Sequence, residues 1–171
     1  SIASRLGWLS KERGDGGASR RYFARSRGDD ALVSAAMLTI WITVAVSLLA
    51  SFAPASVAGS LQRLLALDKV AVADGELWRL LTVTLLHAGL IHLLFNMYAL
   101  YLVGPIVERM YGWKWFFALY LLCALGGSVA SFAVGAGRLA VGASGAIFGL
   151  FGVLVASDRT HRPVLDLRSR A

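Results

Sequence analysis

Four long stretches of the chain carry no charged side chain, and they constrain its fold more than any other feature. They cover residues 31–52, 80–107, 115–137 and 139–157. An α-helix rises about 1.5 Å per residue, so about 20 residues cross the ~30 Å hydrocarbon core of a bilayer. The chain is 57% hydrophobic, yet it has a net charge of +7 because its charges gather between these stretches. This pattern is typical of a multi-pass membrane protein and excludes an ordinary soluble domain.

The uncharged stretches predict an all-α fold, a polytopic bundle with four transmembrane helices. The expected helices are 31–53, 89–107, 115–135 and 144–157. The stretch 80–107 is longer than one span needs, so we assign its beginning to a loop that enters the membrane. The expected segments are a basic N-terminal segment (1–30), a membrane domain (31–157) with an outer loop (55–88), and a tail or the start of a loop to a further helix (158–171).

The distribution of basic residues predicts how the chain lies in the cell membrane. Lys and Arg are concentrated in 1–30 and 158–171, and positively charged flanks favour the cytoplasmic side. Four spans return both flanks to that side, so we expect a cytoplasmic N-terminus and place Ser144 in the outer half of the membrane. A helix over 144–157 measures only about 20 Å. The loop before it is therefore expected below the outer surface, where irregular backbone must be buried in protein or line a water-filled cavity.

The sequence Gly142-Ala143-Ser144-Gly145 places a serine between glycines where a loop becomes an apolar helix. Glycines let other backbone approach closely, and a helix N-terminus offers N–H groups suited to the oxyanion of acyl transfer. This is a setting that favours a nucleophile. The alternative is helix packing, because Gly145 and Gly149 have the four-residue spacing that membrane helices use for packing alone.

His92 and Asn96 are polar residues inside an apolar stretch, and their four-residue spacing puts them on one face of the second helix. Polar side chains at this depth are costly without partners and mark functional sites by default. Hydrogen bonding to neighbouring helices is the alternative role. Trp78 and Arg79 stand side by side at a predicted membrane boundary, where both residue types also serve as plain interface anchors.

Several motifs along residues 31–157, in the right order, resemble the rhomboid intramembrane proteases. They are Trp78-Arg79 in the first outer loop, His87, the string from His92 through Asn96 to Tyr98 with Gly104, Glu108 and Gly112 after it, and Gly142-Ala143-Ser144-Gly145. The resemblance implies that Ser144 is the nucleophile of a serine endopeptidase that cleaves transmembrane proteins. It also implies that His92 and Asn96 donate to the oxyanion, together with backbone N–H groups near Ser144.

The same resemblance implies roles for the residues around this centre. Gly142 and Gly145 belong to the nucleophile motif, and Trp78 and Arg79 belong to a structural loop in the outer leaflet. Glu108 is implied as a structural residue of the second helix near the cytoplasmic side. His87 is expected to be a structural hydrogen-bonder, and Phe148 matches a position on which the catalytic imidazole stacks.

A serine nucleophile needs a base within hydrogen-bond reach. In rhomboids this base is a histidine in an A-H motif on the sixth transmembrane helix, and the sequence after Ser144 has no such motif. His161 follows Ser144 by 17 residues, about 25 Å along a helix, which is too far. His92 is the one substitute in the sequence, yet the resemblance assigns it to the oxyanion. We therefore expect four of six helices, a truncated rhomboid that is poorly stable and inactive alone.

Two other classes of function remain as alternatives. A non-catalytic rhomboid-like protein would bind membrane helices without cutting them, although the presence of Ser144, His92 and Asn96 favours the protease. A fragment of a transporter or channel would explain polar residues in the membrane, but not the G-x-S-G motif. The experiment that separates the first two readings is a search downstream in the gene for a hydrophobic segment with an A-H motif.

No cofactor or metal is expected. Cys123 is the only cysteine, and the three histidines leave little scope for a structural zinc site. The basic N-terminal segment is interpreted as a membrane flank and not as a nucleic-acid-binding tail. The expected partners are transmembrane protein substrates and the lipid bilayer itself.

Overall fold

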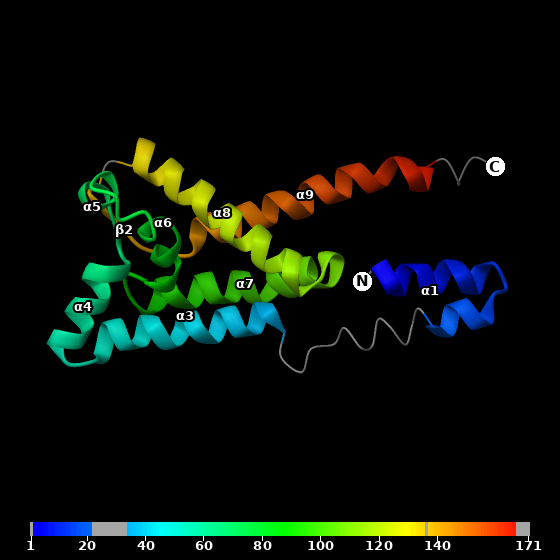
Figure 1. Ribbon diagram of the computed structural model, residues 1–171, viewed down its shortest axis with the longest axis horizontal. Coiled ribbons are helices and arrows are strands. Elements are labelled where there is room, and N and C mark those ends of the chain that lie inside the picture. The colour runs from blue at the N-terminus through cyan, green and yellow to red at the C-terminus, as the bar shows by residue number, and fades with distance from the viewer. Residues whose placement is uncertain (1, 22–33, 136, 167–171) are drawn as a thin grey trace.

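The computed structural model describes the backbone of residues 2–21, 34–135 and 137–166, and the side chains of 6–21, 34–135 and 137–157 (Figure 1). Of the expected basic segment (1–30), the side chains of 6–21 are therefore described, whereas those of the expected tail (158–171) lie outside the described residues. In the first of these ranges the chain forms helix α1, Ile2–Glu12.

Among the residues that the structure describes, three helices are long and apolar enough to cross a membrane: α3 (Ala35–Phe52), α7 (Leu90–Tyr111) and α8 (Trp113–Val134). A fourth helix, α9, runs over Ser144–Asp166, and its apolar part, Ser144–Ser157, is shorter than these spans. The four helices run along the long axis of the molecule (Figure 1). The all-α, multi-pass membrane fold is thereby confirmed, with three clear spans where the sequence predicted four.

Helix boundaries differ from the prediction mainly where an apolar stretch meets charged residues. Helix α7 ends at Tyr111, beyond the expected residue 107, and Gly112 stops it with a φ of 86°. Helix α9 likewise continues past the expected residue 157 to Asp166. Charged residues end a hydrophobic stretch but are good helix formers, so they do not end the helix itself. The length of about 20 Å therefore applies to the apolar part of α9 only.

The outer loop is a set of short elements gathered at one end of the bundle (Figure 1). They are α4 (Ala55–Leu65), β1 (Leu67–Asp68), α5 (Lys69–Ala73), α6 (Arg79–Thr82) and the 3-10 helix η1 (Val83–Leu85). A second strand, β2 (Leu139–Ala140), comes from the segment before α9. It pairs antiparallel with β1, so that Leu67 lies opposite Ala140 and Asp68 opposite Leu139.

Small residues allow the helices to pack closely. A Cβ atom on Gly127 of α8 would stand 2.6 Å from the Cα of Gly145 on α9, so both backbones meet directly. A Cβ on Gly149 would stand 2.4 Å from the Cβ of Cys123, and this contact continues the α8–α9 interface. The glycine spacing that the sequence offered as a packing motif therefore does pack helices here.

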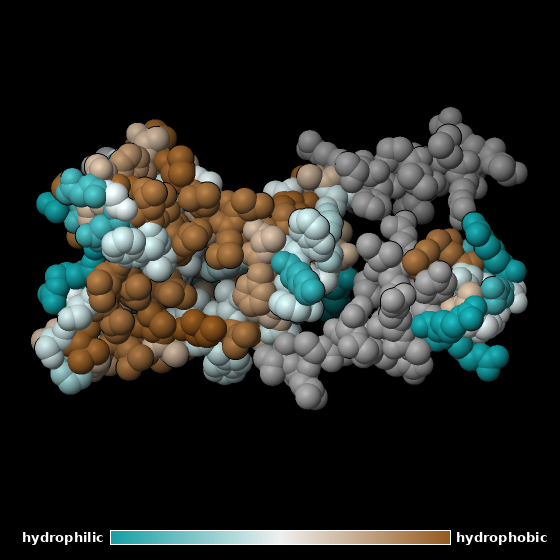
Figure 2. Space-filling view, in the orientation of Figure 1, coloured by the Kyte–Doolittle hydropathy of each residue, from teal (hydrophilic) through white to brown (hydrophobic). Residues whose placement is uncertain are grey.

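The core lies between α3, α7, α8 and α9, and the outside of the bundle is apolar. Fully buried core residues include Leu100, Val103, Val107, Phe116 and Leu150. Hydrophobic residues also cover the surface over α3, α7 and α8 (Figure 2). Among them Trp41 is 67% exposed and Ile91 73% exposed. Such a surface suits contact with lipid tails and would be unusual for a protein in water.

Candidate active site

Ser144 is the first residue of α9, and it is exposed. The turn before it requires Gly142, whose φ of +127° is a conformation that L-residues with a side chain rarely adopt. At the start of the helix, the N–H of Ile147 donates to the carbonyl of Ala143 over 3.0 Å. The first N–H groups of a helix have no carbonyl partner within it, and Ser144 stands at this end of α9.

The imidazole of His92 lies against Gly142. A Cβ atom on Gly142 would stand 3.1 Å from His92 Nε2, 2.9 Å from His92 Cε1 and 3.9 Å from the Ser144 hydroxyl. The ring of His92 and the hydroxyl of Ser144, which come from α7 and α9, therefore border the same small space. Any side chain at position 142 would fill it.

Asn96 lies one turn after His92 on α7, and only 7% of it is exposed. Its side-chain amide donates to the carbonyl of His92 over 2.9 Å. A carboxamide has two N–H donors, so this bond leaves one for a further acceptor. The described hydrogen bond lies within one helix, so it is not the bond between helices that the packing alternative would require.

A cavity of about 80 Å³ adjoins Ser144. Its lining includes hydroxyl groups from three elements: Thr84 of η1, Ser128 and Ser131 of α8, and Ser144 itself. The space is enough for a few water molecules, and the hydroxyls give them hydrogen-bond partners. The cavity thus has room for water close to the serine.

The loop that precedes Ser144 is fixed by the outer loop. The N–H of Gly142 donates to the carbonyl of Val83 over 3.1 Å, and the N–H of Ala143 donates to His87 Nε2 over 3.4 Å. Further back, Arg138 forms two contacts with Asp68, of 3.1 Å and 3.0 Å, beside the β1–β2 pair. Lys69 also bonds the carbonyl of Gly135.

His87 lies in the loop between η1 and α7, outside the three candidate spans. Its Nδ1 lies 3.0 Å from the hydroxyl of Ser47, and its ring meets that of His92 edge-on at 5.1 Å between centroids. Burial and, to a lesser extent, the nearby His92 lower the pKa of His87 to about 4. His87 is therefore neutral at physiological pH and can accept the hydrogen bond from Ala143.

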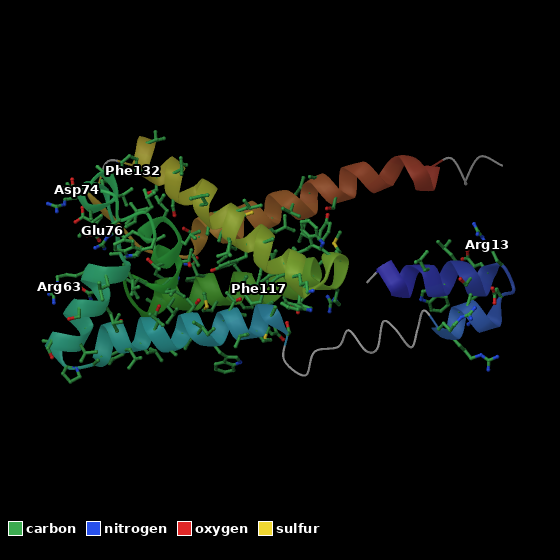
Figure 3. The ribbon with its side chains drawn as sticks, viewed as in Figure 1. Arg13, Arg63, Asp74, Glu76, Phe117 and Phe132 are labelled. Carbon is green, nitrogen blue, oxygen red and sulfur yellow. The ribbon has the colours of Figure 1, made fainter. Side chains whose placement is uncertain are left out.

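Trp78, Arg79 and Thr82 each donate to a carbonyl at the C-terminus of α4. The acceptors are Leu64 for Trp78 (3.2 Å), Ala66 for Arg79 (2.9 Å) and Leu65 for Thr82 (3.1 Å). The last carbonyls of a helix lack internal partners, and a cation there also interacts well with the helix dipole. Only 7% of Arg79 is exposed, and Glu76 pairs with it at 2.5 Å. Arg79 is thus a buried connector within the outer loop (Figure 3 labels Glu76), unlike a lipid-facing interface anchor.

Glu108 lies near the opposite end of the bundle and caps α3. Its carboxylate accepts the N–H groups of Ala35 at 2.8 Å and Ala36 at 3.0 Å, and the hydroxyl of Ser34 at 2.5 Å. A carboxylate at a helix N-terminus satisfies free donors and complements the dipole. Glu108 therefore connects the end of α7 to the start of α3, far from Ser144.

Phe148 lies one turn after Ser144 and is 75% exposed. Among the residues whose side chains are described, no aromatic ring stacks on it. His161 falls on the same helix as Ser144, but its side chain lies outside the described residues. Searching the described part of the chain finds no group of three potential metal ligands.

Ser47 was not among the residues expected at the site. It is 2% exposed, and its hydroxyl joins Leu85 and His87. A signal was present, because Ser47 is a polar residue inside an apolar stretch, as His92 and Asn96 are. Asp68 and Arg138 were also overlooked as partners, since residues 70 positions apart give no local pattern.

Comparison with known proteins finds relatives over the region that forms this site. A family model of the rhomboid domain matches residues 74–168. Rhomboid protease GluP of Bacillus subtilis (strain 168) is 52% identical over 84 residues, which are 49% of this chain and 16% of GluP. RHOMBOID-like protein 5 of Arabidopsis thaliana is 40% identical over 114 residues, which are 66% of this chain and 37% of that protein.

A further relative, putative rhomboid protease YdcA of Bacillus subtilis (strain 168), is 47% identical over 85 residues, which are 49% of this chain and 43% of YdcA. The matches thus span less than half the length of each of these three relatives. The family model, in contrast, covers more than half of the 171 residues, including Ser144, His92 and Asn96. The chain belongs to the rhomboid family.

Proposed function

We propose that this chain supplies the nucleophile and the oxyanion site of a rhomboid-type intramembrane serine endopeptidase whose substrates are transmembrane proteins. One observation carries the proposal. The hydroxyl of Ser144 and the imidazole of His92 border one space at Gly142, at the N-terminus of a helix. The names of the relatives GluP and YdcA, both described as rhomboid proteases, support the same reaction.

In the proposed reaction the oxygen of Ser144 attacks a peptide carbonyl and loses its proton to a base. The carbonyl oxygen becomes an oxyanion, and the amine leaves with a proton as the C–N bond breaks. Water, held in the hydroxyl-lined cavity, then cleaves the acyl–serine ester and regenerates the hydroxyl. Because His92 is assigned to the oxyanion and no A-H motif follows Ser144 in this sequence, we assign the base to an A-H segment outside these 171 residues.

Two backbone N–H groups near Ser144 are already hydrogen-bonded and therefore do not belong to the proposed oxyanion site. The N–H groups of Gly142 and Ala143 already bond Val83 and His87. The N–H of Ser144 together with the side chains of His92 and Asn96 is therefore the proposed donor set. Removing one such donor costs about 3–4 kcal/mol of transition-state stabilisation in a serine protease.

The surrounding residues have structural roles in this proposal. Trp78 and Arg79 hold the outer loop that supports the segment before Ser144, and Glu108 holds the cytoplasmic ends of two helices. Phe148, exposed beside Ser144, would stack on the imidazole of the base. We further propose a cytoplasmic N-terminus, with Ser144 toward the outer side of the membrane.

The non-catalytic alternative is favoured by one observation, the exposed apolar surface beside the site. Phe95 of α7 is 67% exposed and Phe148 of α9 75% exposed, so a membrane helix could bind there without being cut. Both functions would use the same surface, and only chemistry at Ser144 separates them.

The test is labelling of Ser144 with a fluorescent fluorophosphonate, in this chain and in a longer product that continues to an A-H segment. The longer product should label and should cleave a transmembrane substrate, and Ser144→Ala should abolish both. Ser128→Ala, which removes another hydroxyl of the cavity wall, is the matched control and should still label. A longer, folded product in which Ser144 stays unreactive would favour the non-catalytic function.

A further inference from the structure

Three residues far apart in the sequence form a continuous hydrogen-bonded connection behind the site. Ser47 of α3 donates its hydroxyl hydrogen to the carbonyl of Leu85 over 2.8 Å, and its oxygen lies 3.0 Å from His87 Nδ1. The other ring nitrogen, Nε2, lies 3.4 Å from the N–H of Ala143. We call this connection the Ser47–His87–Ala143 relay. It links the first span to the residue that precedes Ser144.

Both ends of the relay require the same tautomer of His87. A serine hydroxyl has one hydrogen, and the carbonyl of Leu85 accepts it. The contact between Ser47 and Nδ1 is therefore a hydrogen bond only if Nδ1 carries the ring proton. At the other end a backbone N–H can donate to Nε2 only if Nε2 is bare. The two requirements are independent, and both give the neutral ring with its proton on Nδ1.

The relay ends at Ala143, the residue before Ser144, and therefore bears on the position of Ser144. Ala143 is completely buried, and it ends the loop in which Gly142 has a positive φ. The N–H of Ala143 donates to His87 Nε2. Without an acceptor at Nε2, a buried N–H would be left unpaired, and the loop would shift to satisfy it.

We propose that Ser47 and His87 are positioning residues: Ser47 fixes the tautomer of His87, and His87 in turn fixes the backbone at Ala143 and hence the orientation of the Ser144 hydroxyl. Neither residue touches the proposed reacting atoms. The relay itself is independent of the proposed function, and only its effect on reactivity rests on Ser144 being a nucleophile.

The first experiment observes the relay directly in the 171-residue chain in detergent micelles. Nitrogen-15 spectra of the unmodified protein, labelled at histidine, should show His87 with a protonated Nδ1 and an unprotonated Nε2. Amide hydrogen exchange should show the N–H of Ala143 protected. A proton on Nε2 of His87, or an unprotected Ala143, would overturn the proposal without any variant being made.

Two substitutions then test the order of the contacts. Ser47→Ala should move the ring proton toward Nε2 and speed exchange at Ala143 by roughly fivefold to tenfold, as expected for the loss of one hydrogen bond. The control is Ser51→Ala, one turn along the same helix, whose hydroxyl bonds only the carbonyl of Ser47 among its described contacts. It should change neither quantity. Equal effects of both variants would mean that Ser47 contributes only to the stability of the helix and does not fix the tautomer of His87.

A conservative pair at His87 separates positioning from bulk. His87→Gln keeps an acceptor that can reach the N–H of Ala143, whereas His87→Asn is too short to do so. Exchange at Ala143 should stay slower in His87→Gln than in His87→Asn, and the rate of Ser144 labelling in the longer product should follow the same order. If labelling fails in every sample while spectra and exchange behave as stated, the relay stands and the proposed function falls.

Discussion

The two ends of this bundle are held together by different forces. At the end that carries Glu108, apolar packing dominates: Val107 and Phe116 are fully buried, and one carboxylate caps α3. At the end that carries Ser144, the elements of the outer loop and the strand β2 are two to eleven residues long and are connected by side-chain donors such as Arg79 and Arg138. Hydrophobic packing thus builds a rigid frame, and hydrogen bonds shape the site on it. Substitutions at the two ends, compared by their effect on stability, test this division.

The largest effect should come from a close contact between helices at the Ser144 end, where Gly127 and Gly145 both line the cavity that adjoins Ser144. Gly127→Ala places a methyl group 2.6 Å from the Cα of Gly145, so α8 and α9 must separate. Overpacking against backbone costs about 1–3 kcal/mol or more. Gly126→Ala is the matched control, because a Cβ there meets nothing within 4 Å. Thermal unfolding in detergent, followed by circular dichroism, should show a large loss for Gly127→Ala and none for Gly126→Ala.

The next effect should come from the buried cation of the outer loop. Arg79→Gln removes the ion pair with Glu76 and the bond to Ala66, so the free energy of unfolding should fall by about 2 kcal/mol, as for the loss of a hydrogen bond from a charged group. Arg138→Gln removes an exposed ion pair from the same end and should cost much less. Chemical denaturation of the two variants gives the comparison. Similar losses would mean that burial does not distinguish the two arginines.

A smaller loss is expected at the other end. Glu108→Gln keeps the shape of the side chain but removes the negative charge that faces the N–H groups of α3. A charged cap contributes about 1 kcal/mol. Asp74→Asn, on an exposed residue, provides the control. Amide exchange at Ala35 and Ala36 should rise in Glu108→Gln alone, and labelling of Ser144 in the longer product should be unaffected.

The smallest effect is a dependence on pH at the strand pair. Hydrogen bonding to Arg138 holds the pKa of Asp68 below its usual value of 3.8. A lowered pKa in the folded state means that the stabilisation is complete above 3.8 and is lost as the pH falls through the lowered value. Stability measured between pH 5 and pH 2 should therefore fall slightly more steeply in the unmodified chain than in Asp68→Asn. Parallel curves would show that this exposed pair contributes nothing.

The helices that apolar packing holds together were predicted from the sequence better than the hydrogen-bonded contacts around the site. Uncharged stretches predicted α3, α7 and α8 within a few residues, because burial in lipid or protein excludes charge along the whole length of a helix. The ends of α7 and α9 were placed too early, since charge ends a hydrophobic stretch without ending a helix. The family was predicted correctly from short motifs.

The contacts that shape the site were less visible in the sequence. Ser144 and His92 could be named from their motifs, but their meeting at Gly142 depends on how α7 and α9 pack. Ser47, Asp68 and Arg138 were missed because their partners are distant along the chain. A hydrogen bond between distant residues leaves no periodic trace, whereas a buried helix face does.

Gly142 is under two constraints at once, and they respond differently to a second substitution. Its backbone conformation disfavours any side chain. Independently, the imidazole of His92 lies only 2.9 Å from the position that a Cβ would take. Replacing His92 by alanine would empty that place but would leave the conformation unchanged. A survey of all substitutions at position 142 should therefore find the same intolerance in both backgrounds. An evolving chain that lost His92 would gain no freedom at Gly142, so the glycine should outlast the histidine.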